Sequence, residues 1–100
     1  MIHVIVTRHP GLVDYLRKTH DVAPNVEVIP HVTDPKQVAH KVVAGVLPLH
    51  LAAEARAVVS VDLNVPAEMR GAELTAEQVE RYATGTRIYR VETVDPVDLA

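Results

Sequence analysis

The stretch Val4-Ile5-Val6-Thr7-Arg8-His9-Pro10-Gly11 decides how the rest of the chain is organised. Residues 2–6 are apolar apart from one histidine, which is typical of a buried strand. From residue 12 to residue 18, apolar and charged residues alternate at helical spacing. Proline suits the first helical position, because its missing N–H would have no partner there. The sequence therefore predicts a buried strand, a tight turn and an amphipathic helix.

This turn is also a candidate anion-binding site. A helix N-terminus carries free backbone N–H groups and the positive end of the helix dipole, which attract phosphate above all. Thr7, Arg8 and His9 lie at the same point, where a strand ends. Ligands gather at the carboxyl ends of strands in open α/β sheets, so we expect these side chains to be functional. The alternative is an ordinary turn with a solvated arginine and histidine.

Composition limits the possible function. The chain has 100 residues, 48% of them hydrophobic, and we expect a single domain spanning residues 1–100. Its net charge of −3 provides no basic field for long nucleic acid, so any polyanionic ligand must be small and locally held. The absence of cysteine excludes disulfides and thiolate chemistry, and fits a reducing interior. Without a signal-like start or a run of about 18 apolar residues, we expect a cytoplasmic protein that does not enter a membrane.

Strand and helix signals alternate along the chain. After the first strand and helix, strands are predicted at residues 26–29, 41–46, 58–63 and 86–91. Helices are predicted at 34–40, 47–57 and 75–84, with Gly85 ending the last, and residues 95–100 are expected to fray. Capping boxes at Asp34–Gln37 and Thr75–Gln78 mark two helix starts. The pattern predicts one Rossmann-like α/β domain: a mostly parallel five-stranded sheet, helices on both faces, and the first strand inside the sheet.

Two further segments at the same sheet edge carry candidate residues. After the third strand come Leu47, Pro48 and His50, another proline-led helix start. The irregular segment after the fourth strand contains Asn64, Glu68, Arg70 and Glu73, and a loop of that length is often functional. His50 is otherwise a packed or surface histidine, and the charges of the later loop otherwise form structural salt bridges.

Several kinds of site are absent from the sequence. The six histidines lack metal-binding spacing, and no cysteine supports them, so neither a metal nor a cofactor is expected. The glycines form no dinucleotide or Walker fingerprint. The lone serine, Ser60, lies within a predicted strand, which argues against hydrolysis by a serine nucleophile. Arg8-His9 is similar to the Arg-His-Gly of histidine phosphatases, but Pro10 precedes the glycine, and no second His-Gly pair follows.

Three segments together resemble a small family of type III CRISPR accessory proteins. They are residues 6–11, 47–54 and 63–75, and their order and spacing match over nearly the whole chain. Members are regarded as ring nucleases, which linearise cyclic oligoadenylate messengers, chiefly cyclic tetra-adenylate, and so switch off the antiviral response. The resemblance implies a CARF-like domain. Carried over by motif, it gives three groups of candidates: Thr7, Arg8, His9 and Gly11; Leu47, Pro48 and His50; and Pro66, Glu68, Arg70, Gly71 and Glu73. Among the candidates of these segments, we expect catalysis from Arg8, His9 and His50, and ligand binding from Thr7, Arg8, Gly11, Leu47, Pro48, Asn64, Glu68, Arg70 and Glu73.

The implied chemistry agrees with the residues. A cyclic tetra-adenylate carries four phosphates in a symmetric ring. A symmetric homodimer would offer this ring two identical binding sites. Cleavage needs no metal if a ribose 2′-hydroxyl attacks its neighbouring phosphate. Arg8 would bind phosphate, and His9 or His50 would act as base or acid. A binder that only sequesters the messenger needs the same arginine but no proton-transfer group, and the sequence leaves both alternatives open.

Overall fold

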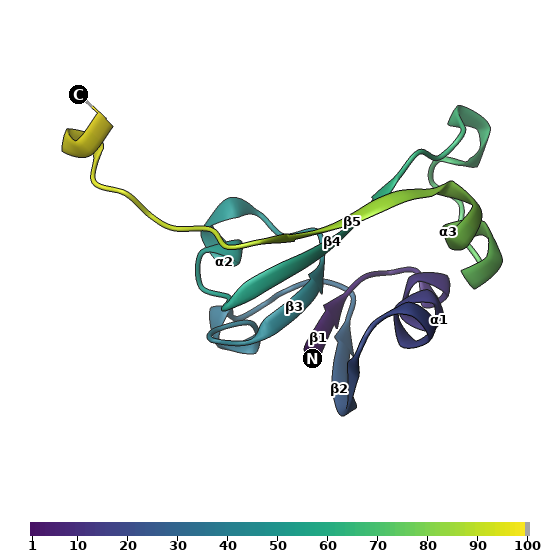
Figure 1. Ribbon diagram of the computed structural model, residues 1–100, viewed down its shortest axis with the longest axis horizontal. Coiled ribbons are helices and arrows are strands. Elements are labelled where there is room, and N and C mark those ends of the chain that lie inside the picture. The colour runs from purple at the N-terminus through teal and green to yellow at the C-terminus, as the bar shows by residue number, and fades with distance from the viewer. Residues whose placement is uncertain (100) are drawn as a thin grey trace.

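A computed structural model describes residues 1–99 and contains one five-stranded sheet (Figure 1). The strand order is β2-β1-β3-β4-β5. The strands are β1 (Ile2–Val6), β2 (Val22–Ile29), β3 (Val42–Gly45), β4 (Ala57–Leu63) and β5 (Ala83–Tyr89). All neighbours are parallel except β4 and β5, which are antiparallel. The mostly parallel sheet is confirmed, and β1 lies inside it as expected.

Helices lie on both faces of the sheet (Figure 1). The helices are α1 (Pro10–Thr19), α2 (Leu49–Ala52) and α3 (Ala76–Tyr82), and the 3-10 turns are η1 (Pro35–Gln37), η2 (Ala67–Met69) and η3 (Pro96–Leu99). Figure 1 shows α1 and α3 side by side, with α2 on the other side of the sheet. No helix within residues 1–99 is both long and apolar enough to cross a membrane.

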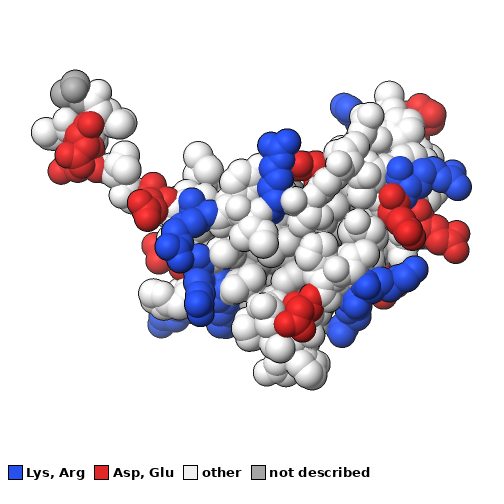
Figure 2. Space-filling model, in the orientation of Figure 1, with Lys and Arg blue, Asp and Glu red and all other residues white. Residues whose placement is uncertain are grey.

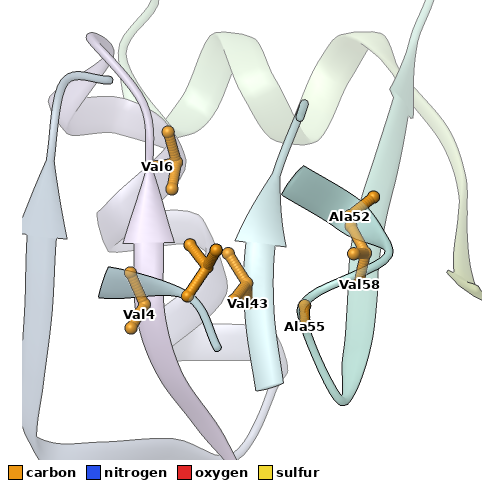
Figure 3. Close-up of a cluster of buried hydrophobic side chains, with 7 residues drawn as sticks. Val4, Val6, Val43, Ala52, Ala55 and Val58 are labelled. Atoms are coloured by element: carbon orange, nitrogen blue, oxygen red, sulfur yellow. The ribbon is translucent and has the colours of Figure 1, made fainter. Parts of the chain in front are cut away.

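The period-two pattern of β1 supplies a core on each face. Val4 and Val6 belong to a cluster that includes Val38 and residues of α2 and β4 (Figure 3). Ile5 points the other way and packs with Leu16 of α1. Fully burying such a side chain is worth about 1.5–3 kcal/mol, so both faces of β1 anchor the domain.

Two predicted helices are much shorter than expected. The segments 34–40 and 47–57 contain only η1 and α2. The capping box at Asp34 is confirmed. The helical turn nevertheless ends at Gln37, and Val38 is buried in the core. After α2, the N–H of Arg56 donates to the carbonyl of Lys41, which draws the chain into the sheet before residue 57. Tertiary pairing overrides helix propensity at both places.

The ends of three other elements also differ. Gly85 does not end a helix: α3 stops at Tyr82, and Gly85 lies in β5 opposite Asp62. The capping box at Thr75 is confirmed. Strand β2 starts at Val22 rather than at residue 26, and it accepts Pro24 because it lies at the sheet edge, where a missing N–H leaves no ladder partner unsatisfied. β5 covers 83–89 instead of 86–91.

Beyond β5 the chain leaves the body of the domain and ends well away from it (Figure 1). Most of this segment is exposed and irregular. It still contains one ordered turn, η3, in which the carboxylate of Asp95 accepts a hydrogen bond from the N–H of Val97. The predicted frayed tail at 95–100 is therefore partly a structured turn, and its last residue lies outside the described residues.

Candidate functional site

The turn after β1 lies at the sheet edge between β1 and β3, where the strand order reverses direction. The connection through α1 leads to β2 on one side of β1, whereas β3 lies on the other side. In doubly wound sheets, this switch between neighbouring strands opens a crevice at the carboxyl ends. A cavity of about 390 Å³ lies here, and its polar side chains are Thr7, Arg8 and His9. Apolar residues of β1, α1, β3 and β4, together with Pro30 after β2 and Val46 after β3, form the remainder of its wall.

The same three residues also border a second cavity. This cavity of about 250 Å³ is lined by Thr7, Arg8 and His9 together with residues of α1 and Val28 of β2. Arg8 is exposed, and His9 is half-buried. The guanidinium group of Arg8 is therefore available to an anion. All three side chains belong to the turn between β1 and α1, which holds them close together.

Hydrogen bonds fix the backbone of the turn. The N–H of Thr7 donates to the carbonyl of Ile29 at 2.9 Å, and the Thr7 hydroxyl oxygen accepts from the N–H of His9 at 3.0 Å. The N–H of Leu12 donates to the carbonyl of His9 at 3.1 Å. Because the N–H groups of His9 and Leu12 are bonded within the turn and Pro10 has no N–H, the helix end offers fewer free donors than expected. Arg8, rather than the helix end, is the main attraction for an anion.

His9 contains an unusual buried atom. Its Nδ1 is buried, and within residues 1–99 it has no hydrogen-bond partner. Leaving a buried polar atom unpaired costs about 1–3 kcal/mol, and such atoms need a specific explanation in a native fold. Among the buried side-chain polar atoms of residues 1–99, this nitrogen is thus the one that the fold leaves unpaired.

Two glycines allow close backbone packing on either side of the turn. A Cβ on Gly45 would lie 2.2 Å from the carbonyl oxygen of Val6, and its φ of +129° also favours glycine. A Cβ on Gly11 would lie 2.1 Å from the carbonyl oxygen of Leu74, just before α3. Gly11, predicted to bind ligand, thus has a packing role here. Gly45 was missed, although a glycine ending a predicted strand is itself a signal of close approach.

The second predicted group lies apart from this cavity. Leu47 lines a separate apolar groove between α2 and β5. The carbonyl of Pro48 accepts the N–H groups of Leu51 and Ala52, so this residue starts α2. His50 is exposed on α2 and lines neither cavity at Arg8. The structure does not bring His50 and His9 into one cavity.

The third predicted group is divided. The backbone N–H of Asn64 donates to the carbonyl of Tyr82 at 2.9 Å. Glu68 and Arg70 are exposed around η2 and line neither cavity at Arg8. Only Glu73 reaches the start of α1, where it shares a cavity of about 320 Å³ with Pro10 and Gly11. The expected alternative, a salt-bridged loop, is not found: within residues 1–99 the ion pair is Arg87–Asp62, at 3.2 Å.

Within residues 1–99, no group of three or more histidine, aspartate or glutamate side chains is placed to hold a metal ion.

Comparisons with known proteins identify the family. Comparisons with curated proteins and with solved structures give no match. Residues 4–92 match the family model described as "Putative CRISPR-associated protein (Cas_VVA1548)", a region that contains the Arg8-His9 turn and both later segments. Since the match covers most of the chain, this protein belongs to the CRISPR-associated family Cas_VVA1548.

Proposed function

We propose that this protein is a ring nuclease, which binds and linearises cyclic oligoadenylate and thereby switches off type III CRISPR signalling. One observation carries the proposal: Arg8 and His9 stand together over a cavity at the switch edge of the sheet. Membership of a CRISPR-associated family supports it. The sequence resemblance to ring nucleases supplies the reaction and the preferred messenger, cyclic tetra-adenylate.

The cavity dimensions favour a ligand shared between two copies. Ligand cavities span about 300–1,000 Å³, and the cavity of about 390 Å³ lies near the lower limit. It can take one nucleotide unit, with Arg8 on the phosphate and the apolar wall against the base. A ring of four nucleotides needs more room. We therefore propose a two-fold homodimer in which the two β1–α1 turns face the ring from opposite sides.

Cleavage proceeds within the ligand itself. His9 takes the proton of a ribose 2′-hydroxyl, and that oxygen attacks the neighbouring phosphorus. The bond from phosphorus to the 5′ oxygen breaks, and this oxygen takes up a proton. The ring opens to a chain with a 2′,3′-cyclic phosphate at one end and a 5′-hydroxyl at the other. Arg8 binds the phosphate and stabilises the charge that develops on it.

The two proton transfers need two groups. His9 is the imidazole among the residues that line the cavity, and Thr7 and Arg8 are its other polar side chains. The leaving oxygen therefore takes its proton from water or from the second copy. His50 is a less suitable donor, since it is exposed on α2 outside both cavities.

One experiment separates the possible functions. Cyclic tetra-adenylate is incubated with the protein in excess EDTA, and the products are separated by chromatography. A linear product ending in 2′,3′-cyclic phosphate supports the proposal, and His50→Ala should give it at the wild-type rate. Intact ring that remains bound would identify a sponge instead of an enzyme. Activity that EDTA abolishes and manganese restores would refute the metal-independent mechanism.

The histidine-phosphatase alternative gives a different result. It predicts phosphohistidine on His9 after incubation with a phosphomonoester, and no consumption of the ring. Absence of both binding and cleavage of cyclic tetra-adenylate would overturn the proposed function altogether.

A further inference from the structure

An apolar groove lies on the α2 face of the sheet, between α2 and β5. It has a volume of about 230 Å³, and Leu49, Val58 and Tyr89 are among the apolar residues that line it. Val58 and Tyr89 face each other across β4 and β5. The rim is unusually apolar: Leu49 is 76% exposed, and Val46 is 86% exposed. Exposed apolar residues grouped in this way are typical of an interaction surface or a ligand groove.

The C-terminal arm, residues 92–99, carries apolar side chains that have nothing to pack against. Val97 and Leu99 are 75% and 77% exposed, and Val94 is also exposed. The radius of gyration is 14.4 Å, against about 13 Å for a typical domain of this length, because the arm projects from the body (Figure 1). The cap by Asp95 orders the turn that presents these side chains.

The charges of the arm and the body are complementary. The arm contains Glu92, Asp95 and Asp98. Arg56 and Arg90 line a cavity that adjoins the groove, since Val91 borders both, and Glu92 of the same chain lines this cavity as well. Neither arginine forms an ion pair within residues 1–99. Figure 2 shows acidic side chains along the arm and basic side chains on the body where the arm leaves it.

We propose that two copies of the protein exchange their C-terminal arms. The arm of one copy lies in the groove of the other, with Val97 and Leu99 against the apolar rim around Leu49. The carboxylates of Asp95 and Asp98 then lie beside Arg56 and Arg90 of the other copy. Reciprocal exchange forms two identical contacts and closes a two-fold dimer.

The direction of the arm indicates that it binds in the groove of a second copy rather than in the groove of its own chain. The arm starts beside the groove, since Val91 is a groove residue, and from there it runs away from the body (Figure 1). Residues 92–95 span up to about 14 Å when extended, and the 3-10 turn η3 adds about 8 Å, which suffices to reach a neighbouring copy. Val46 lines both the groove and the cavity at Arg8, so the exchanged arm would also support one wall of that cavity. The inference rests on these surfaces and does not depend on ring cleavage.

Because the chain contains no cysteine, cross-linking gives a clean test. Leu49→Cys and Val97→Cys are prepared as separate full-length proteins with different tags, mixed, oxidised and run on a non-reducing gel. We expect a disulfide between the two tagged chains. The matched control replaces Leu49→Cys with Ile88→Cys, which is exposed on the opposite face of β5 and should give no such product.

Two outcomes would overturn arm exchange. One is the absence of the mixed disulfide, or its formation equally with Ile88→Cys. The other is that the double variant L49C/V97C forms its disulfide within one chain, which would show that the arm folds onto its own body.

A second measurement uses charge and needs no cross-link. Light scattering without cyclic oligoadenylate, so that no ring can join two copies, should give twice the monomer mass for the wild type and the monomer mass for V97D/L99D, whereas Ile88→Asp should remain a dimer. A wild-type monomer, or a V97D/L99D dimer, would also refute the proposal. The ring assay is scored separately, so failure of one proposal does not count against the other.

Discussion

Substituting Gly11 by alanine tests whether the contact between α1 and α3 holds the turn in place. The new Cβ would lie 2.1 Å from the carbonyl oxygen of Leu74 and 2.4 Å from the carbonyl carbon of Thr75. Both atoms belong to the backbone, so no side-chain rotation relieves the overlap. Heavy atoms in contact are normally about 3.5 Å apart, and the backbone before α3 must therefore move away by about 1.4 Å.

The cost follows from two opposing effects. Overpacking of this kind costs about 1–3 kcal/mol, and contact with backbone places Gly11→Ala near the upper limit. Alanine recovers up to about 1 kcal/mol through its higher helix propensity. The net loss is about 2 kcal/mol, which lowers Tm by roughly 8–16 °C in a domain of this size.

Thermal unfolding followed by circular dichroism measures this effect. Gly85→Ala is the matched control, since a Cβ there would meet nothing within 4 Å and its φ is not positive. Gly85→Ala should leave Tm unchanged or raise it slightly, because alanine restricts the unfolded chain. If Gly11→Ala is as stable as Gly85→Ala, then the close approach of α1 and α3 is not a constraint on this fold.

Three further substitutions probe the core and the turn. Ile5→Ala, at a fully buried position, should lower the free energy of unfolding in urea by about 2–5 kcal/mol. His3→Ala, at the exposed position of the same strand, should change it by less than about 0.5 kcal/mol. Arg8→Ala should weaken binding of cyclic tetra-adenylate roughly ten- to a hundredfold in calorimetry. Arg17→Ala, at the other end of α1, should leave the affinity unchanged. If the two variants bind the ring with equal affinity, Arg8 is not part of the binding site. His9→Ala should keep most of the affinity yet slow single-turnover cleavage by about 10²- to 10⁴-fold, and an unchanged rate would exclude His9 as the base.

The sequence predicts this fold best where the signal is local. Residues 2–6 and the helix after Pro10 carry clear patterns, and both elements form as expected. Capping boxes mark two helical starts correctly, because they consist of hydrogen bonds between near neighbours. Where an element ends depends on distant partners. The early end of α2 follows from the pairing of Arg56 with Lys41, and no short window of sequence contains that information.

The same limit applies to the candidate site. Thr7, Arg8 and His9 could be placed together because one turn carries them, and the structure keeps them around one cavity. Gly45 and Val46 complete the wall only because β3 lies beside β1, which is a long-range pairing. His50 follows β3 in a similar way, yet α2 leaves it exposed outside both cavities. Position after a strand identifies an edge of the sheet, but packing decides which side chains share a cavity.

The position of Arg8 and His9 therefore depends on two residues that have no side chains. Gly45 lets the end of β3 approach the carbonyl of Val6, and Gly11 lets the backbone before α3 approach the start of α1. The turn is held between these contacts and by the hydrogen bond from Thr7 to Ile29. A misplacement of about 1 Å can cost about a hundredfold in rate when a catalytic group must meet its substrate in line. Either glycine can thus govern activity without touching the ligand, and substitutions there should lower the cleavage rate along with stability.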